Sequence, residues 1–110
     1  MSDQPAKSEE FVALLTLTEH GRGRAEAAGE SLAAARDKLL ERSEASTVKL
    51  MYWTIGAFDA VVAADVPSLE YMVWFLALIG ETGFFSTQSL LCVSLDTFTA
   101  TNVPDRHHAV

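Results

Sequence analysis

The sequence predicts one α+β domain whose elements follow the order β-α-β-β-α-β. Two strand-like runs meet at Gly56 near the centre of the chain, and each flank adds one helical and one strand-like segment. The strand-like runs alternate with a period of two, whereas the helical segments repeat apolar residues every three or four positions. A chain of 110 residues has room for one such domain, because single domains commonly run to about 100–150 residues.

The first strand is expected at Glu10 to Thr18, which reads EFVALLTLT. The positions that point to one face are apolar, and so are most of those that point to the other. A strand of this kind is covered on both sides and does not lie against water. The segment that follows, Glu19 to Gly23, contains two glycines and is predicted as a turn.

An amphipathic helix is expected from Arg24 to Arg42. Glu26 and Glu30 lie near its start and Lys38 and Arg42 near its end, where each sign complements the helix dipole. Four apolar residues at spacings of four, three and four form its buried stripe: Ala28, Leu32, Ala35 and Leu39. Gly29 costs this helix up to about 1 kcal/mol relative to alanine. We expect it to permit a close approach of the helix to the sheet.

The central hairpin consists of two alternating runs, Thr47 to Trp53 and Phe58 to Asp65. Strict alternation puts three side chains of the first run on each face: Val48, Leu50 and Tyr52 on one, Lys49, Met51 and Trp53 on the other. Gly56 lies in the connecting turn, where a positive φ is often required and is adopted poorly by residues with a Cβ.

The second helix is expected from Leu69 to about Gly80, with Ser68 as its N-cap. Its core stripe is predicted to contain Met72, Phe75, Leu76 and Ile79. Three further large residues lie off that stripe: Tyr71, Trp74 and Leu78. Because the helix is apolar most of the way round, we expect another subunit or a protein partner to cover these three residues. The last strand is predicted from Phe84 to Leu95.

Right-handed crossovers around a central hairpin turn this order into a four-stranded antiparallel sheet with both helices on one face, a ferredoxin-like arrangement. The domain is expected over residues 10–99, with flexible tails at 1–9 and 100–110. Because the strands are apolar on both faces, the face without helices also needs a cover. We therefore expect a homodimer, or a higher homo-oligomer, in which two sheets pack together as a dimeric α+β barrel.

The composition excludes several classes of partner. Fifteen acidic residues against eight basic ones give a formal charge of −7, which disfavours both nucleic acid and anionic membrane surfaces. No apolar run approaches the roughly 20 residues that span a bilayer. The N-terminus lacks the order of a secretory signal, and the single cysteine, Cys92, cannot form an internal disulfide. We therefore expect a cytoplasmic protein.

The run TIGAFDAVVAADVPS resembles the signature of the GYD-domain family: a Gly-x-aromatic-Asp turn, an apolar strand of small residues and a helix that begins after a proline. The resemblance covers the chain from about Phe11 to Thr99, and Gly56 and Asp59 match. Phe58 stands where the family has its tyrosine, so a role that needs a phenol hydroxyl does not transfer. The family is similar to the dimeric α+β barrel group, which includes cofactor-light oxygenases, haem-handling enzymes and small-molecule sensors, but it has no settled activity of its own.

Two residues are candidates for catalysis. His20 follows the first strand on a glycine-rich loop, where binding residues often lie, and Asp59 begins the second half of the hairpin. Both could transfer protons. Asp59 has an alternative role, a hydrogen bond to the backbone of the turn, and this structural role is the one we favour.

Four aromatic residues could line a pocket for a ligand, although core and subunit packing also explains them: Tyr52, Trp53, Phe58 and Trp74. The tail residues Asp105, His107 and His108 resemble a metal-binding group, but adjacent histidines in a mobile tail rarely form a preorganised site. We predict no metal and no cofactor.

Two functions are therefore open. The first is a binding, sensing or assembly module with a small apolar cavity between the sheet and the helices. The alternative is a small cofactor-light enzyme, of the oxygenase or isomerase type, that uses His20 and Asp59 for proton transfer. We favour the first, because catalysis needs a cluster of converging polar groups and the chain offers two candidates.

Overall fold

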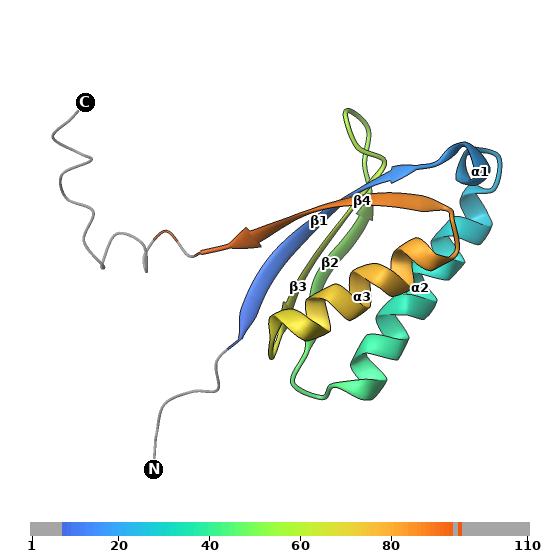
Figure 1. Ribbon diagram of the computed structural model, residues 1–110. Helices are drawn as coiled ribbons and strands as arrows, with labels where there is room; N and C mark the ends of the chain where they lie inside the picture. The colour runs from blue at the N-terminus through green and yellow to red at the C-terminus, as the bar shows by residue number, and fades with distance from the viewer. Residues whose placement is uncertain (1–7, 94, 96–110) are drawn as a thin grey trace, which may run out of the picture.

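The computed structural model describes residues 8–93 and 95, and its elements follow the predicted β-α-β-β-α-β order with one short helix added (Figure 1). The elements are β1 (Glu9–Leu17), α1 (Glu19–Arg22), α2 (Ala25–Arg42), β2 (Thr47–Trp53), β3 (Ala60–Val66), α3 (Leu69–Glu81) and β4 (Phe85–Cys92). The two predicted tails, 1–9 and 100–110, fall outside the described residues except for Ser8 and Glu9, and Glu9 already belongs to β1.

The four strands form one antiparallel sheet in the order β2-β3-β1-β4, which confirms the predicted fold class. β1 lies in the middle and pairs along most of its length with β3 on one side and β4 on the other. Both long helices, α2 and α3, cover the same face of this sheet (Figure 1). β2 and β4 are the edge strands.

The hydrophobic core lies between the sheet and the two long helices. The predicted stripe of α2 is confirmed, because all four of its residues are buried in this core: Ala28, Leu32, Ala35 and Leu39. Phe11 from β1 meets Phe75 from α3 edge to face, with 6.2 Å between the ring centroids. Such aromatic pairs add about 0.5–1.5 kcal/mol beyond the burial of their surface.

A β-bulge at Lys49 changes which residues of β2 share a face. The register shifts between Val48 and Leu50, so that strict alternation fails at this point. Val48 therefore lies on the helix-covered face together with Met51 and Trp53. Leu50 and Tyr52 lie on the opposite face, where the side chain of Lys49 also bonds to its neighbours. The predicted grouping of Val48 with Leu50 is wrong, because a bulge inserts one extra residue into the strand.

The burial of α3 also differs from the prediction. Phe75 and Ile79 are fully buried as expected. The three residues predicted to lie off the core stripe are instead half-buried and pack against the core: Tyr71, Trp74 and Leu78. α3 contacts α2 as well as the sheet, so it buries a wider arc of its surface than one stripe. The exposed line of this helix contains Leu69, Val73 and Ala77. A partner on Tyr71, Trp74 and Leu78 stays a prediction.

The segment predicted as a turn after β1 forms the short helix α1. The hydroxyl of Thr18 caps it by accepting a hydrogen bond from the N–H of Gly21. Gly21 is buried, and a Cβ at this position would collide with the backbone carbonyl of Phe84. The glycine is therefore needed for the close approach of α1 to the segment before β4.

Candidate functional site

The sheet face that α2 and α3 leave uncovered, here called the open face, is apolar at its centre. The registers put six apolar residues from all four strands on it: Val12, Leu14, Leu50, Val61, Ala63 and Leu90. Leu90, on the edge strand β4, is 48% exposed. No described helix lies over this face (Figure 1). An apolar face of this kind is a candidate interaction or binding site.

A hollow of about 330 Å³ lies on the open face beside the loop that joins β2 to β3. It is lined by Leu14, Thr54, Ile55, Ala57, Phe58 and Val61. The lining side chains are apolar apart from Thr54. We call this feature the hairpin hollow.

The loop that forms one wall of the hollow is held by its own hydrogen bonds. The N–H of Thr54 donates to the carbonyl of Asp59 at 2.8 Å, and the Thr54 hydroxyl donates to the carbonyl of Phe58 at 2.7 Å. Gly56 has a φ of 142°, so its predicted need for a positive φ is confirmed. Ile55, at the tip of the loop, is fully exposed. The loop thus exposes the apolar side chain of Ile55 to solvent, while hydrogen bonds hold its backbone in place.

Asp59 ties this loop to the central strand. Its carboxylate Oδ2 accepts a hydrogen bond from the N–H of Leu17 at 2.7 Å, and its own N–H donates to the carbonyl of Leu15 at 2.8 Å. The carboxylate of Asp59 therefore bonds to β1, whereas its backbone carbonyl accepts the hydrogen bond from Thr54 in the turn. The contact positions the hairpin loop over the open face.

His20 lies near the same end of β1 but beside the other neighbouring strand. It is exposed on α1, and its ring stacks on that of Phe84 with 5.0 Å between the centroids and 6° between the planes. Phe84 bonds through its carbonyl to the N–H of Thr18. Asp59 thus approaches β1 from the β3 side and His20 from the β4 side, and neither residue lines the hairpin hollow. Their proposed part in proton transfer stays a prediction.

The four aromatic residues predicted to share a pocket are distributed over three hollows. Tyr52 and Trp53 line a cavity of about 70 Å³ at the edge of the sheet. Phe58 lines the hairpin hollow, and Trp74 lines a third depression of about 280 Å³ beside α3. The small cavity of Tyr52 and Trp53 lies between α2 and the sheet. The largest of these three hollows is on the open face, whereas the sequence predicts an apolar cavity between the sheet and the helices.

The sequence alone could not show this hollow, because two separate features build it. Leu14 and Val61 are neighbours across β1 and β3. Ile55 and Phe58 come from the loop between β2 and β3, whose position over the sheet depends on the bond between Asp59 and Leu17. The one signal in the sequence was the presence of two large apolar residues, Ile55 and Phe58, in a loop whose turn does not require apolar side chains.

One end of the open face carries a charged cluster. The ammonium of Lys49 lies 2.9 Å from the carboxylate of Glu10 and 3.4 Å from that of Asp65. The hydrogen bond that Lys49 donates to Glu10 raises the pKa of Lys49 above its ordinary value. Desolvation opposes this shift, and the charges of Asp65 and Glu10 add to it. The single ammonium thus pairs with both carboxylates, and the cluster retains one net negative charge.

The other residues singled out in the sequence are Cys92 and the histidines of the tail, and of these Cys92 does not line the hairpin hollow. Cys92 is a half-buried free thiol near the end of β4. Within residues 8–93, no three metal-binding side chains come together, and Asp105, His107 and His108 lie outside the described residues. No helix in the described part of the chain is both long enough and apolar enough to cross a membrane.

Comparison with known proteins places the chain in a family. Residues 11–106 match the model of the GYD domain. The chain belongs to the GYD-domain family. The match confirms the resemblance carried by the run around Gly56 and Asp59, and it spans all three helices and the sheet from Phe11 onward. Among curated proteins, none matches this GYD-domain chain.

Solved structures share the fold of this GYD-domain chain. The solution structure of the de novo designed protein LFR1 1 with ferredoxin fold aligns over 80% of the chain and 87% of its own length, with a TM-score of 0.54 and 8% identity. The crystal structure of MtbAldR aligns over 78% of the chain with a TM-score of 0.55 and 13% identity. The GYD-domain chain covers 52% of the length of MtbAldR. Both likenesses concern the fold alone, and the first confirms the ferredoxin-like prediction.

Proposed function

We propose that this GYD-domain chain is a homodimeric binding module that holds a small apolar molecule in the hairpin hollow. Two copies pack their open faces together, and each copy closes the hollow of the other from solvent. The observation that carries the proposal is the position of a 330 Å³ apolar hollow on a sheet face that no described element covers.

A second copy of the chain is the partner that this face fits. An isologous two-fold interface brings the same patch together from both subunits, so it favours a surface that is complementary to itself. The apolar centre of the open face satisfies this condition. Its charged cluster lies at one end of the face, outside this apolar centre, where Lys49 pairs with Glu10 and Asp65. Two sheets packed in this way lie about 10 Å apart, and their inward side chains form a second core.

The lining of the hollow defines the ligand. Leu14, Val61 and Phe58 offer apolar contacts, and Thr54 uses its hydroxyl in the bond to the carbonyl of Phe58. A charged ligand would lose its hydration there without gaining a partner, which is costly. The volume of about 330 Å³ lies at the lower end of the range for small-molecule sites, roughly 300–1,000 Å³. A small apolar molecule therefore fits best.

Binding is favoured over catalysis because the two candidate catalytic residues, Asp59 and His20, make structural contacts elsewhere. The carboxylate of Asp59 is bonded to the backbone of β1, and His20 stacks on Phe84 at the other side of that strand. A catalytic site needs polar groups that converge on one point. The residues that line the hairpin hollow do not include such a group of converging polar side chains.

The experiment is a titration with the neutral fluorescent probe N-phenyl-1-naphthylamine. We expect saturable binding, and we expect Val61→Gln to weaken it about tenfold, which corresponds to about 1.4 kcal/mol. Val73→Gln is the matched control, because Val73 is exposed on the outer side of α3. Equal binding by both variants, or no saturable binding by the unmodified chain, would contradict the proposal.

A further inference from the structure

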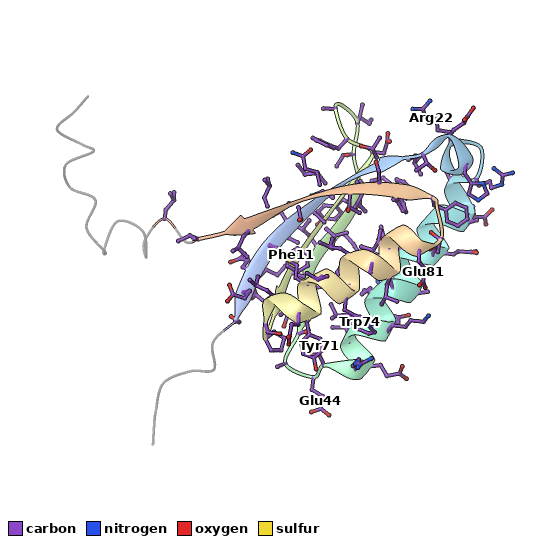
Figure 2. All side chains as sticks on the ribbon, in the orientation of Figure 1. Phe11, Arg22, Glu44, Tyr71, Trp74 and Glu81 are labelled. Carbon is purple, nitrogen blue, oxygen red and sulfur yellow. The ribbon has the colours of Figure 1, made fainter. Side chains whose placement is uncertain are left out.

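A second depression lies on the helical side of the molecule, away from the open face. It occupies about 280 Å³ between the end of α2 and the start of α3, and it is lined by Arg42, Glu70, Tyr71 and Trp74. Figure 2 shows Tyr71 and Trp74 on the side of α3 that points toward the end of α2. We call this feature the α2–α3 hollow.

The aromatic wall of the α2–α3 hollow is fixed in place. Tyr71 and Trp74 are half-buried and pack against the core, so their exposed parts form a rigid surface. The guanidinium of Arg42 lies 4.9 Å from the centroid of the Trp74 ring. This is a cation–π contact, which orients the arginine at the rim of the hollow.

Two opposite charges flank this wall without neutralising each other. The ion pairs within residues 8–93 join Arg36 to Asp37, and Lys49 to Glu10 and Asp65. Arg42 and Glu70 therefore do not pair with one another, although both line the same hollow. The guanidinium and the carboxylate are both available to a ligand.

We propose that the α2–α3 hollow binds a small zwitterion that carries an apolar group, of the kind represented by an apolar α-amino acid. Arg42 binds the carboxylate of the ligand, because a guanidinium matches that group with two parallel hydrogen bonds. Glu70 binds its ammonium. The apolar group lies on the surface formed by Tyr71 and Trp74.

The pair of charges selects this class over simpler ligands. A wholly apolar molecule would take water from Arg42 and Glu70 and give no bond in return. A metal cation would be repelled by the guanidinium, and a phosphate group by the carboxylate. A zwitterion satisfies both. The volume of about 280 Å³ accommodates a molecule of amino-acid size.

The experiment uses calorimetric titration of the full chain with phenylalanine, leucine and glycine. We expect saturable binding of phenylalanine and leucine, with a Kd of about 1 mM or tighter, and weaker binding of glycine, which lacks the apolar group. Two half-ligands test the charge pairing. 3-Phenylpropionate keeps the carboxylate and 2-phenylethylamine keeps the ammonium, and each should bind at least about tenfold more weakly than phenylalanine.

Single variants test which group of the ligand each charged residue binds. Arg42→Gln should remove the advantage of phenylalanine over 2-phenylethylamine, and Glu70→Gln should remove its advantage over 3-phenylpropionate. Arg36→Gln and Glu81→Gln are matched controls on the same two helices outside the hollow, and we expect both to bind phenylalanine like the unmodified chain. Circular dichroism verifies that each variant is folded.

A second readout places the ligand. In the Trp53→Phe chain, Trp74 is the one remaining tryptophan, and its fluorescence should change as phenylalanine saturates the site. The proposal is overturned if none of the three amino acids binds saturably. It is also overturned if phenylalanine and both half-ligands bind equally. The result does not depend on the hairpin hollow, because none of these variants alters a residue that lines it.

Discussion

The carboxylate of Asp59 accepts a hydrogen bond from the backbone N–H of Leu17, a residue 42 positions earlier in the chain, with 2.7 Å between Oδ2 and N. This bond joins the hairpin loop to the central strand. It stabilises the fold and also positions the loop that forms one wall of the hairpin hollow.

Asp59→Ala should lower the free energy of unfolding by about 1–3 kcal/mol, because the part-buried N–H of Leu17 loses its acceptor. Asp59→Asn should cost roughly half as much, since it keeps an acceptor oxygen but loses the charge. Urea unfolding measures both. Unchanged stability in Asp59→Ala would show that the bond contributes nothing, and the same variant should also bind the naphthylamine probe more weakly.

Gly21→Ala should destabilise the protein by about 1–3 kcal/mol or more, as overpacking of a filled site does. The new Cβ would collide with the carbonyl of Phe84 and would lie 3.0 Å from Cδ2 of Leu17. Gly80→Ala is the matched control: its Cβ would meet no atom within 4 Å, and we expect a gain of roughly 0.5 kcal/mol. Thermal unfolding distinguishes the two, and similar midpoints would contradict the close approach of α1 to Phe84.

Gly29→Ala should raise the free energy of unfolding by about 0.5 kcal/mol, less than the full gain of about 1 kcal/mol for alanine in a helix. The new Cβ would lie 3.3 Å from Cζ2 of Trp53, so the indole has to move by a few tenths of an ångström. Trp53 is 52% exposed on the edge strand β2 and has room to do so. A loss of stability would instead show that Trp53 is held rigidly, and its fluorescence in a Trp74→Phe background reports the movement.

The Lys49 cluster makes stability depend on pH in the alkaline range. The pKa of Lys49 is raised from 10.5 in the folded chain, chiefly by its hydrogen bond to Glu10. The contribution of Lys49 to the free energy of unfolding is therefore fully present below the pKa that Lys49 has in the unfolded chain. It is lost as the pH rises through the pKa that Lys49 has in the folded chain. Lys49→Met should be less stable than the unmodified chain at pH 8, and the difference should shrink above pH 10.5. Thermal midpoints measured across this range, at low salt, check the direction; a constant difference would contradict it.

The order of elements could be predicted from the sequence because each relies on local pattern. The stripe of α2 shows this most clearly: its four apolar residues face one neighbour, so their spacing alone identifies them. Gly56 is a second case, since a turn with positive φ has a strong preference for glycine.

Features that depend on more than one neighbour could not be predicted. The bulge at Lys49 moved Val48 to the other face of β2, and no alternating pattern reveals where an extra residue is inserted. Because α3 contacts both the sheet and α2, Tyr71 and Trp74 are half-buried, although a single predicted stripe leaves them outside the core. The hairpin hollow likewise depends on a bond between residues 42 positions apart.

The mass of the folded particle at micromolar concentration, measured by light scattering, tests the assembly most directly. We predict two chains for the unmodified protein and for the control Val73→Asp, whose substituted residue is exposed on the outer side of α3. Leu14→Asp and Leu90→Asp, which put a charge on the open face, should give folded single chains. A single chain for the unmodified protein, or two chains for both open-face variants, would contradict the packing of one open face against another.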